Sequence, residues 1–252
     1  MHRHTCATLI RAGVNVVGIV RCERRGLRSN AQFYAKRLRR YGVATTVGQI
    51  LGRIAERALN GRFERERLRD LIDVDGDRAV IANAAIPGAL TTSYGRADTM
   101  AWLAQRDPDI LLVHSKFIVS KKVRALAKVA VIGGHPGITP WYRGGFSAFW
   151  AVRRGDLDRV GWTVFVLDDG VDTGPVIRQE KLDIEPGRDS HNTLGWRGMV
   201  EEAKAQAEAI LHLDSGTPLT IHPVESVPRE SYFSAPTLGD FVKYRRDQST
   251  VR

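Results

Sequence analysis

Short, continuous apolar runs alternate with helical patterns along most of this chain, and this alternation limits the folds that it can adopt. The runs at 110–113 and 129–132 are strand-sized and rich in aliphatic residues, as strands buried on both faces are. Strands that alternate with helices pair in parallel, and the helices then cover the sheet. We therefore expect an α/β fold, in which an open, mostly parallel, Rossmann-like sheet has helices on both faces.

The expected elements follow from these periodicities. Helices are expected at 5–12, 27–69, 98–105, 121–127, 147–153 and 190–213. Strands are expected at 14–20, 79–83, 110–113, 129–132, 161–167 and 175–182. Residues 1–215 are predicted to form one α/β domain, and 216–252 a C-terminal extension without a domain of its own.

Residues 27–72 are interpreted as a helical, basic insertion. One apolar stripe at helical spacing predicts that this insertion packs on the flank of the domain. The stripe consists of Val47, Ile50, Leu51, Ile54 and Ala58.

The net charge of +10 is concentrated near the start of the chain, where residues 1–70 hold sixteen Lys and Arg against five Asp and Glu. A cationic region of this kind attracts nucleic acid, anionic lipid or a phosphorylated substrate, but a solvated helical face has the same composition. Cys6 and Cys22 have no metal-site or disulfide spacing, and no apolar run is long enough to span a membrane. We expect a cytoplasmic protein with no membrane partner.

Ligands of open parallel sheets bind at the carboxyl ends of the strands, which here points to the loops at 114–117 and 133–140. The second loop, Gly-Gly-His-Pro-Gly-Ile-Thr-Pro, sets His135 in an irregular backbone that a ligand can approach closely. Histidine titrates near neutral pH and can stabilise an oxyanion or transfer a proton, although a lone histidine is more often structural.

A further, acidic loop lies at 167–174 and reads Leu-Asp-Asp-Gly-Val-Asp-Thr-Gly. It holds three carboxylates: Asp168, Asp169 and Asp172. Its spacing lacks the terminal glutamate of a calcium loop, so no metal is expected. An aspartic protease would need a second Asp-Thr-Gly, which this chain does not contain. A simple acidic turn remains the alternative.

Together the histidine loop at 133–140 and the acidic loop at 167–174 resemble the folate-dependent formyltransferase family. This family includes glycinamide ribonucleotide, methionyl-tRNA and sugar N-formyltransferases. The resemblance is carried by 135–177, with the ordered combination His-Pro, Tyr-Arg-Gly, Gly-x-Thr and Asp-Thr-Gly-Pro, and more weakly by 110–213 and 235–241. It implies an enzyme that transfers a formyl group from 10-formyltetrahydrofolate to a primary amine. His135 and Asp172 match the family's catalytic histidine and aspartate.

The same resemblance implies two further sets of residues. The folate pocket would comprise Phe117, Ile118, Val119, Leu167, Asp168, Asp169, Gly170 and Val171. The substrate loop would comprise Ser115, Ile138, Pro140, Tyr142, Arg143 and Gly144.

The chain departs from the family at Gly133, where the family motif Asn-x-His has asparagine. Loss of one oxyanion donor of this kind costs on the order of 10²–10³ in rate. The candidates to replace the donor are Ser115, His114 and the backbone amides of the Gly133-Gly134 pair.

A second departure lies at the start, because family members open with a strand and this chain opens in a helix. We expect the first strand of the sheet to be missing from the sequence as it stands, Met1 not to be the true start, and the protein to extend upstream.

The expected substrate is a nucleotide-linked amino sugar, whose phosphates would suit the basic region. Methionyl-tRNA formyltransferases carry an additional C-terminal domain, and glycinamide ribonucleotide formyltransferases lack an insertion like 27–72. Both activities remain alternatives, as does a catalytically weak relative that binds folate or a nucleotide sugar. Nucleic acid is not the expected partner, and a homodimer is compatible with the sequence.

Overall fold

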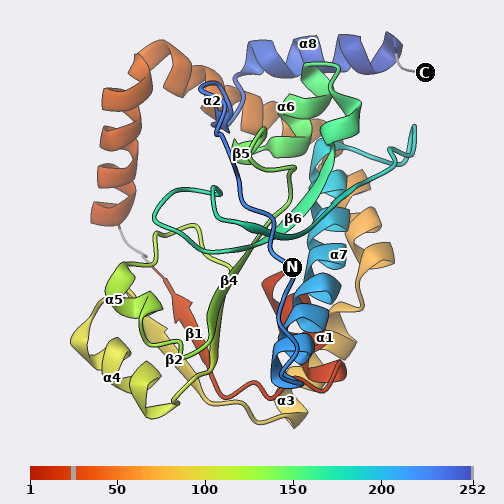
Figure 1. Ribbon diagram of the computed structural model, residues 1–252. Helices are drawn as coiled ribbons and strands as arrows, with labels where there is room; N and C mark the ends of the chain where they lie inside the picture. The colour runs from red at the N-terminus through yellow and green to blue at the C-terminus, as the bar shows by residue number, and fades with distance from the viewer. Residues whose placement is uncertain (24–26, 251–252) are drawn as a thin grey trace.

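The computed structural model describes residues 1–23 and 27–250 and shows a mixed α/β architecture (Figure 1). In chain order the elements are α1 (His2–Arg11), β1 (Ile19–Cys22), α2 (Leu27–Leu71), α3 (Val74–Asn83), β2 (Gly88–Thr91), α4 (Ala97–Gln105), β3 (Ile110–Val113), α5 (Lys121–Arg124), β4 (Ala130–His135), β5 (Arg143–Gly144), α6 (Ser147–Arg153), the 3₁₀ helix η1 (Leu157–Arg159), β6 (Gly161–Val166), β7 (Val176–Lys181), α7 (His191–Asp214), β8 (Tyr232–Phe233) and α8 (Leu238–Thr250).

The largest described sheet has the strand order β3-β4-β6-β7. β3 and β4 are parallel, with α5 in the crossover between them, whereas β4 pairs with β6 and β6 with β7 in antiparallel fashion. The short connection at 167–175 returns the chain directly beside β6, and a return this short gives an antiparallel pair. The expected open α/β sheet is therefore confirmed, with an antiparallel half that the sequence pattern did not distinguish.

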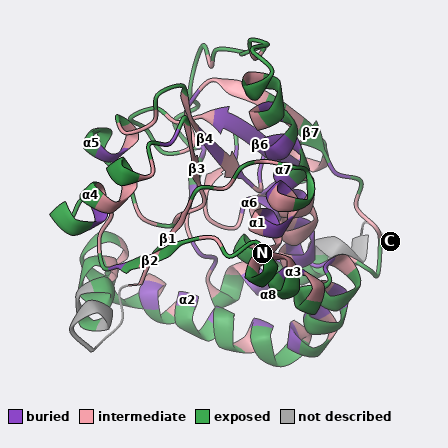
Figure 2. Ribbon diagram, turned by 90° about the horizontal axis from the view of Figure 1, so that it is seen from below, coloured by how far each residue is buried: buried purple, intermediate pink, exposed green. Residues whose placement is uncertain are grey.

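The core of this sheet lies against α7. Ile132 of β4 is fully buried, and Figure 2 shows β4 and β6 largely in the colour of buried residues. The cluster at this face comprises Ile132, Trp162, Val164, Leu182, Ala205 and Ala209. A second cluster is built around Phe149 of α6, with Phe241 and Tyr244 of α8 joining it. The strand that ends in His135 is thus fixed in the best-packed part of the molecule.

The sheet is interrupted between β1 and β3. β1 pairs in parallel with β2 to form a separate two-stranded sheet, and within the described residues neither strand pairs with β3.

The insertion is helical, as predicted, but α2 packs by the opposite face from the one expected. It is kinked at Gly42, whose φ of 78° interrupts the helix. Ile54 of the predicted apolar stripe is 61% exposed, whereas Gln49 on the opposite side is 2% exposed. The buried side is polar because it bonds to polar partners: Gln49 Nε2 donates to the Ala235 carbonyl at 2.7 Å, and Asn192 Nδ2 donates to Glu56 Oε1 at 2.9 Å.

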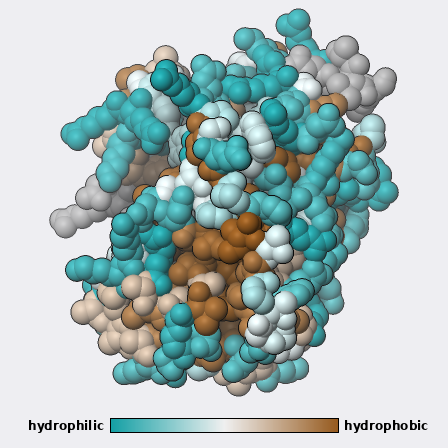
Figure 3. All heavy atoms as spheres, in the orientation of Figure 1, coloured by the Kyte–Doolittle hydropathy of each residue, from teal (hydrophilic) through white to brown (hydrophobic). Residues whose placement is uncertain are grey.

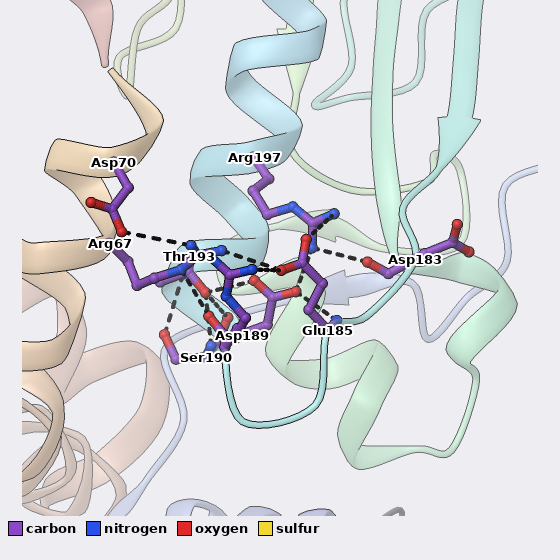
Figure 4. A network of polar contacts seen from close by, with 9 residues as sticks. Arg67, Asp70, Asp183, Glu185, Asp189, Ser190, Thr193 and Arg197 are labelled. Atoms are coloured by element: carbon purple, nitrogen blue, oxygen red, sulfur yellow. Dashed lines mark hydrogen bonds and ion pairs between the residues drawn. The ribbon is translucent and has the colours of Figure 1, made fainter. Parts of the chain in front are cut away.

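A polar network joins the end of α2 to the start of α7 (Figure 4). Arg67 Nε donates to the Arg188 carbonyl at 3.0 Å, and Arg197 pairs with Asp189. Ser190 caps α7 in a reciprocal capping box with Thr193, and its hydroxyl also donates to Glu64 Oε1 of α2 at 2.7 Å. Ser190 therefore caps the N-terminus of α7 and also bonds this helix to α2.

Two expected strands need correction, and one strand was not expected. The expected strand at 79–83 is the end of α3, a helix that Asp73 caps by accepting from the Gly76 amide at 2.9 Å. A four- or five-residue apolar run does not by itself separate helix from strand. The strand expected at 14–20 is observed at Ile19–Cys22, and its partner Gly88–Thr91 was not predicted.

Ser190→Ala is expected to lower the free energy of unfolding by about 1–2 kcal/mol, because it removes the helix cap and one buried partner of Glu64. Urea denaturation measures the change. The control Ser215→Ala, an exposed hydroxyl near the other end of α7, should cost less than about 0.5 kcal/mol. Equal costs for the two variants would contradict the assigned role of Ser190.

Candidate active site

His135 lies at the end of β4, and the Nε2 side of its ring is held by hydrogen-bond partners. It is 5% exposed, and its Nε2 lies 2.8 Å from both the Tyr142 carbonyl oxygen and Ser147 Oγ. A carbonyl oxygen only accepts hydrogen bonds, so Nε2 carries a proton. Nδ1 is then the ring nitrogen that is left to gain or release a proton.

Asp172 faces that nitrogen. Its Oδ2 lies 3.5 Å from His135 Nδ1, beyond ordinary hydrogen-bond length but within ion-pair range, and it accepts the Gly144 amide at 2.9 Å. The residue has a φ of 52°, in the left-handed region that aspartate tolerates better than most side chains. The two predicted catalytic residues therefore come together at the carboxyl end of β4.

A buried hydrogen-bond network braces the loop that follows His135. Thr163 Oγ1 donates to the Gly137 carbonyl at 2.7 Å, and Gln179 Nε2 donates to the Thr139 carbonyl at 2.7 Å and to Thr163 Oγ1 at 2.8 Å. Sequence reasoning missed both side chains. A polar threonine in the otherwise apolar strand 161–166 was the available signal.

The predicted substrate-loop residues have different surroundings. Ile138, Pro140 and Tyr142 are buried; Tyr142 stacks on Phe233 and donates its hydroxyl to Asp156, so it meets His135 through its carbonyl. Arg143 Nη1 donates to the Val171 carbonyl at 3.0 Å, which places a guanidinium beside the acidic loop.

The acidic loop forms a braced turn. Asp168 Oδ1 accepts the Gly170 amide at 3.0 Å and Thr173 Oγ1 at 2.8 Å, and Arg124 Nη1 donates to the Asp168 carbonyl at 2.7 Å. Hydrogen bonds from Lys121 and Arg124 hold the pKa of Asp169 below its ordinary value. Of the predicted folate residues that follow β3, Phe117 and Val119 are half-buried, and Ile118 is 85% exposed.

Leu167 fills the position that a side chain at residue 133 would need. A Cβ built on Gly133 would lie 2.3 Å from Leu167 Cδ1 and 3.1 Å from the Phe165 ring. Of the two side-chain candidates to replace the donor, His114 is already bonded, because its Nε2 lies 2.8 Å from Gln206 Oε1. Ser115 Oγ accepts from the Tyr94 hydroxyl at 3.1 Å and from the Phe117 amide at 3.0 Å, which leaves its own proton to donate.

A buried carboxylic acid, Glu202, lies beside Gly134, and sequence reasoning missed it. Glu202 of α7 is 1% exposed, and its Oε1 accepts Gln206 Nε2 at 3.2 Å and lies 3.5 Å from His114 Nδ1. A Cβ on Gly134 would lie only 1.9 Å from that oxygen, so the glycine leaves room for the carboxyl. Burial, aided by the charge of Asp172, raises the pKa of Glu202 to about 8. Burial lowers the pKa of His114 to about 4.

Two negative findings apply to residues 1–23 and 27–250. No helix there has the length and apolar composition to cross a membrane, and no group of three or more His, Cys, Asp or Glu side chains is arranged to hold a metal ion.

Fold and site together define an α/β domain with a histidine–aspartate pair at the carboxyl end of a buried strand. Residues 86–210 match the family described as Formyl transferase. The chain belongs to the formyl transferase family through this segment, which contains both His135 and Asp172.

Three comparisons illustrate the relationship. The chain is 30% identical over 116 residues to a GDP-perosamine N-formyltransferase of Brucella melitensis, covering 46% of this chain and 44% of that protein. It is 38% identical over 98 residues to human mitochondrial 10-formyltetrahydrofolate dehydrogenase, covering 38% and 10%. The structure of a phosphoribosylglycinamide formyltransferase from Coxiella burnetii superposes with a TM-score of 0.54 at 16% identity, over 92% of this chain and 94% of that one, and shows the shared fold. The chain thus matches less than half the length of either curated relative.

Gly133→Asn is expected to destabilise the protein by about 1–3 kcal/mol, because the new side chain collides with Leu167. Adding Leu167→Ala should make the asparagine less costly, which a double-mutant cycle by urea denaturation measures. Gly145→Asn is the matched control, since a Cβ there meets no atom within 4 Å. A cost at Gly133 no larger than at Gly145 would contradict the described packing.

Glu202 is expected to make stability fall as pH rises. Between its ordinary pKa of 4.5 and its folded value of about 8, the unfolded chain loses a proton that the folded chain keeps. The lowered pKa of His114 acts in the opposite direction below its ordinary value of 6.5, and the lowered pKa of the Met1 amino group does so below its ordinary value of 8.0. The contribution of Glu202 is therefore measured between pH 6.5 and 8 as the difference between the natural protein and Glu202→Gln.

The slope from Glu202 is at most about 1.4 kcal/mol per pH unit. Urea denaturation of the natural protein and of Glu202→Gln across this range provides the test. The variant should lose the fall, and identical slopes in the two proteins would show that Glu202 is ionised when folded.

Proposed function

We propose that this protein transfers a formyl group from 10-formyltetrahydrofolate to the primary amine of a nucleotide-linked amino sugar. The observation that carries the proposal is the geometry of His135 and Asp172, in which Nδ1 and a carboxylate oxygen face each other at 3.5 Å. Membership of the formyl transferase family supports formyl transfer in general. We also place the reaction in the cytoplasm, since both cysteines are free thiols.

The two residues divide the proton chemistry. When the amine nitrogen bonds to the formyl carbon, the carbonyl oxygen becomes an oxyanion, and a protonated Nδ1 of His135 can donate to it. Asp172 stabilises that imidazolium and accepts the proton that the amine releases. When the bond from the formyl carbon to the folate nitrogen breaks, His135 gives its Nδ1 proton to the leaving nitrogen. Asp172, which faces Nδ1, then passes to Nδ1 the proton taken from the amine and restores both residues. Nε2 keeps its proton throughout because the Tyr142 carbonyl holds it.

The formyl donor would bind beside the acidic turn. Folate supplies an activated formyl group on a planar, partly apolar molecule. Ile118 offers a largely exposed aliphatic side chain, and Val171 another that is partly exposed. Arg124, which follows the 117–119 segment, donates to the Asp168 carbonyl and so ties that segment to the turn. Phe117, Val119 and the backbone of 167–171 would complete this pocket.

Cationic and aromatic groups near Asp172 support an amine substrate that carries phosphate. Arg40 of α2 lies 5.5 Å from the Tyr232 ring, and Tyr232 pairs with Arg143 in the small β5–β8 sheet. Arg143 in turn reaches the carbonyl of Val171, the neighbour of Asp172. A nucleotide sugar is also the type of substrate named for the Brucella melitensis relative.

One observation favours a second function. Leu167 occupies the space beside Gly133 and leaves no room there for the amide donor of the family motif. A protein that binds folate or a nucleotide sugar with little turnover would have no need of that donor.

An assay of tetrahydrofolate release distinguishes the two functions. With 10-formyltetrahydrofolate and a panel of nucleotide-linked amino sugars, we expect absorbance to report turnover that His135→Ala and Asp172→Ala each reduce by at least about 10²-fold. His212→Ala and Asp75→Ala, which remove the same side chains away from the site, should leave the rate unchanged. Folate binding without turnover would support the binding protein, and full activity in either site variant would refute the assigned roles.

A further inference from the structure

The apolar stripe of α2, which the sequence predicts to be buried, is exposed along its whole length. All five of its residues are exposed: Val47, Ile50, Leu51, Ile54 and Ala58. Val43, which is 68% exposed, extends the stripe by one turn toward the kink. Figure 2 shows the outer side of α2 in the colour of exposed residues, at the edge of the molecule. A continuous apolar surface of this kind is typical of a binding site.

The contacts of α2 with the rest of the described chain leave the stripe open. Helix α7 meets the polar side of α2, through the hydrogen bond of Asn192 to Glu56. Helix α8 lies against a glycine, because a Cβ on Gly52 would lie 2.9 Å from the Phe241 ring. At about 100° per residue, Gly52 and Glu56 lie on the side of the helix that is turned away from the centre of the stripe. The stripe can therefore meet a separate surface.

The first part of α2 is strongly basic and carries exposed aromatic rings. Residues 27–55 contain six Lys and Arg and no Asp or Glu. Lys36 and Arg39 are exposed, and so are Phe33 and Tyr34, whose rings meet edge to face. In Figure 3, hydrophilic side chains with hydrophobic ones among them cover this part of α2, at the upper left. A surface that complements α2 must therefore offer negative charge as well as apolar contact.

An anionic lipid surface meets this requirement better than a second copy of the chain. Two copies joined through the stripe would bring two basic segments without carboxylates against each other, and their repulsion would oppose the contact. From Val43 to Ala58 the stripe is about 22 Å long, and the exposed Arg57 lies beside it. Helices that lie in a membrane interface combine aliphatic and aromatic side chains with Lys and Arg in this way. The cytoplasmic leaflet of a membrane carries the complementary negative charge.

We propose that α2 binds the surface of an anionic lipid bilayer. The stripe and Val43 would lie at the boundary between headgroups and acyl chains, and Lys36, Arg39 and Arg57 would contact the headgroup phosphates. The helix would lie along the membrane and would not cross it. The expectation of no membrane partner rests on the absence of an apolar run long enough to span a bilayer, and a helix that lies on the surface needs no such run.

The test measures co-sedimentation of the full chain with vesicles of phosphatidylcholine, with and without phosphatidylglycerol. We expect binding only when phosphatidylglycerol is present. The double variant Val47→Ser/Ile54→Ser should weaken binding at least about tenfold, because it removes aliphatic groups from the lipid contact. The matched control Val227→Ser/Ile221→Ser changes exposed side chains of the same kinds outside α2 and should bind as the natural protein does. Because all four side chains are exposed, Tm should change by less than about 2 °C in either variant.

A second pair of variants tests the contribution of charge. Lys36→Gln/Arg39→Gln should weaken binding at least about tenfold at low salt, and added salt should weaken the binding of the natural protein. The matched control Lys122→Gln/Arg229→Gln removes the same two charges from exposed positions outside α2 and should have little effect.

Three results would overturn the proposal. Absence of binding to the anionic vesicles would do so directly and would favour an acidic protein as the partner. Binding that the charge variant weakens and the stripe variant does not would show adsorption by charge alone. Self-association of the chain without lipid, measured by sedimentation velocity over a range of concentrations and abolished by the stripe variant, would assign the stripe to a second copy. None of these measurements depends on catalytic activity.

Discussion

The antiparallel pairing of β4 with β6 is the constraint on which the rest of the site depends. It sets His135 opposite Thr163 and Gly133 opposite Phe165. Thr163 braces the loop after His135 through its hydrogen bond to the Gly137 carbonyl. The ring of Phe165 helps to close the space beside Gly133. A slip of one residue would move His135 to the α7 face, away from the Tyr142 carbonyl and Asp172.

The ionisable side chains on the two faces of β4 are in different environments. On one face, the histidine is tied to a carbonyl and faces a carboxylate that a backbone amide also holds. On the other, burial holds Glu202 protonated and His114 neutral near neutral pH. Gly133 and Gly134 lie between them, and each lacks a side chain for a steric reason that the structure shows. The missing asparagine is therefore part of a local packing arrangement that includes Leu167.

Much of the fold and the site pair could be predicted because the information is local. Strand Ile110–Val113 and helix Ser147–Arg153 are marked by their own periodicity, and His135 and Asp172 each stand in a distinctive loop. Glu202 could not be assigned, because its role depends on a glycine in a distant strand. The packing face of α2 was predicted wrongly because the surface that it meets is polar, so hydrogen bonds through Gln49 replaced apolar contact.

The orientation of the His135 ring is the central claim of this account, and nitrogen-15 NMR of the histidine side chains tests it most directly, with His135→Gln providing the assignment. The structure predicts that the neutral ring carries its proton on Nε2, held by the Tyr142 carbonyl, and that Nδ1 is the nitrogen without a proton. A neutral ring with its proton on Nδ1 and a bare Nε2 would contradict it, because such a ring cannot donate to that carbonyl.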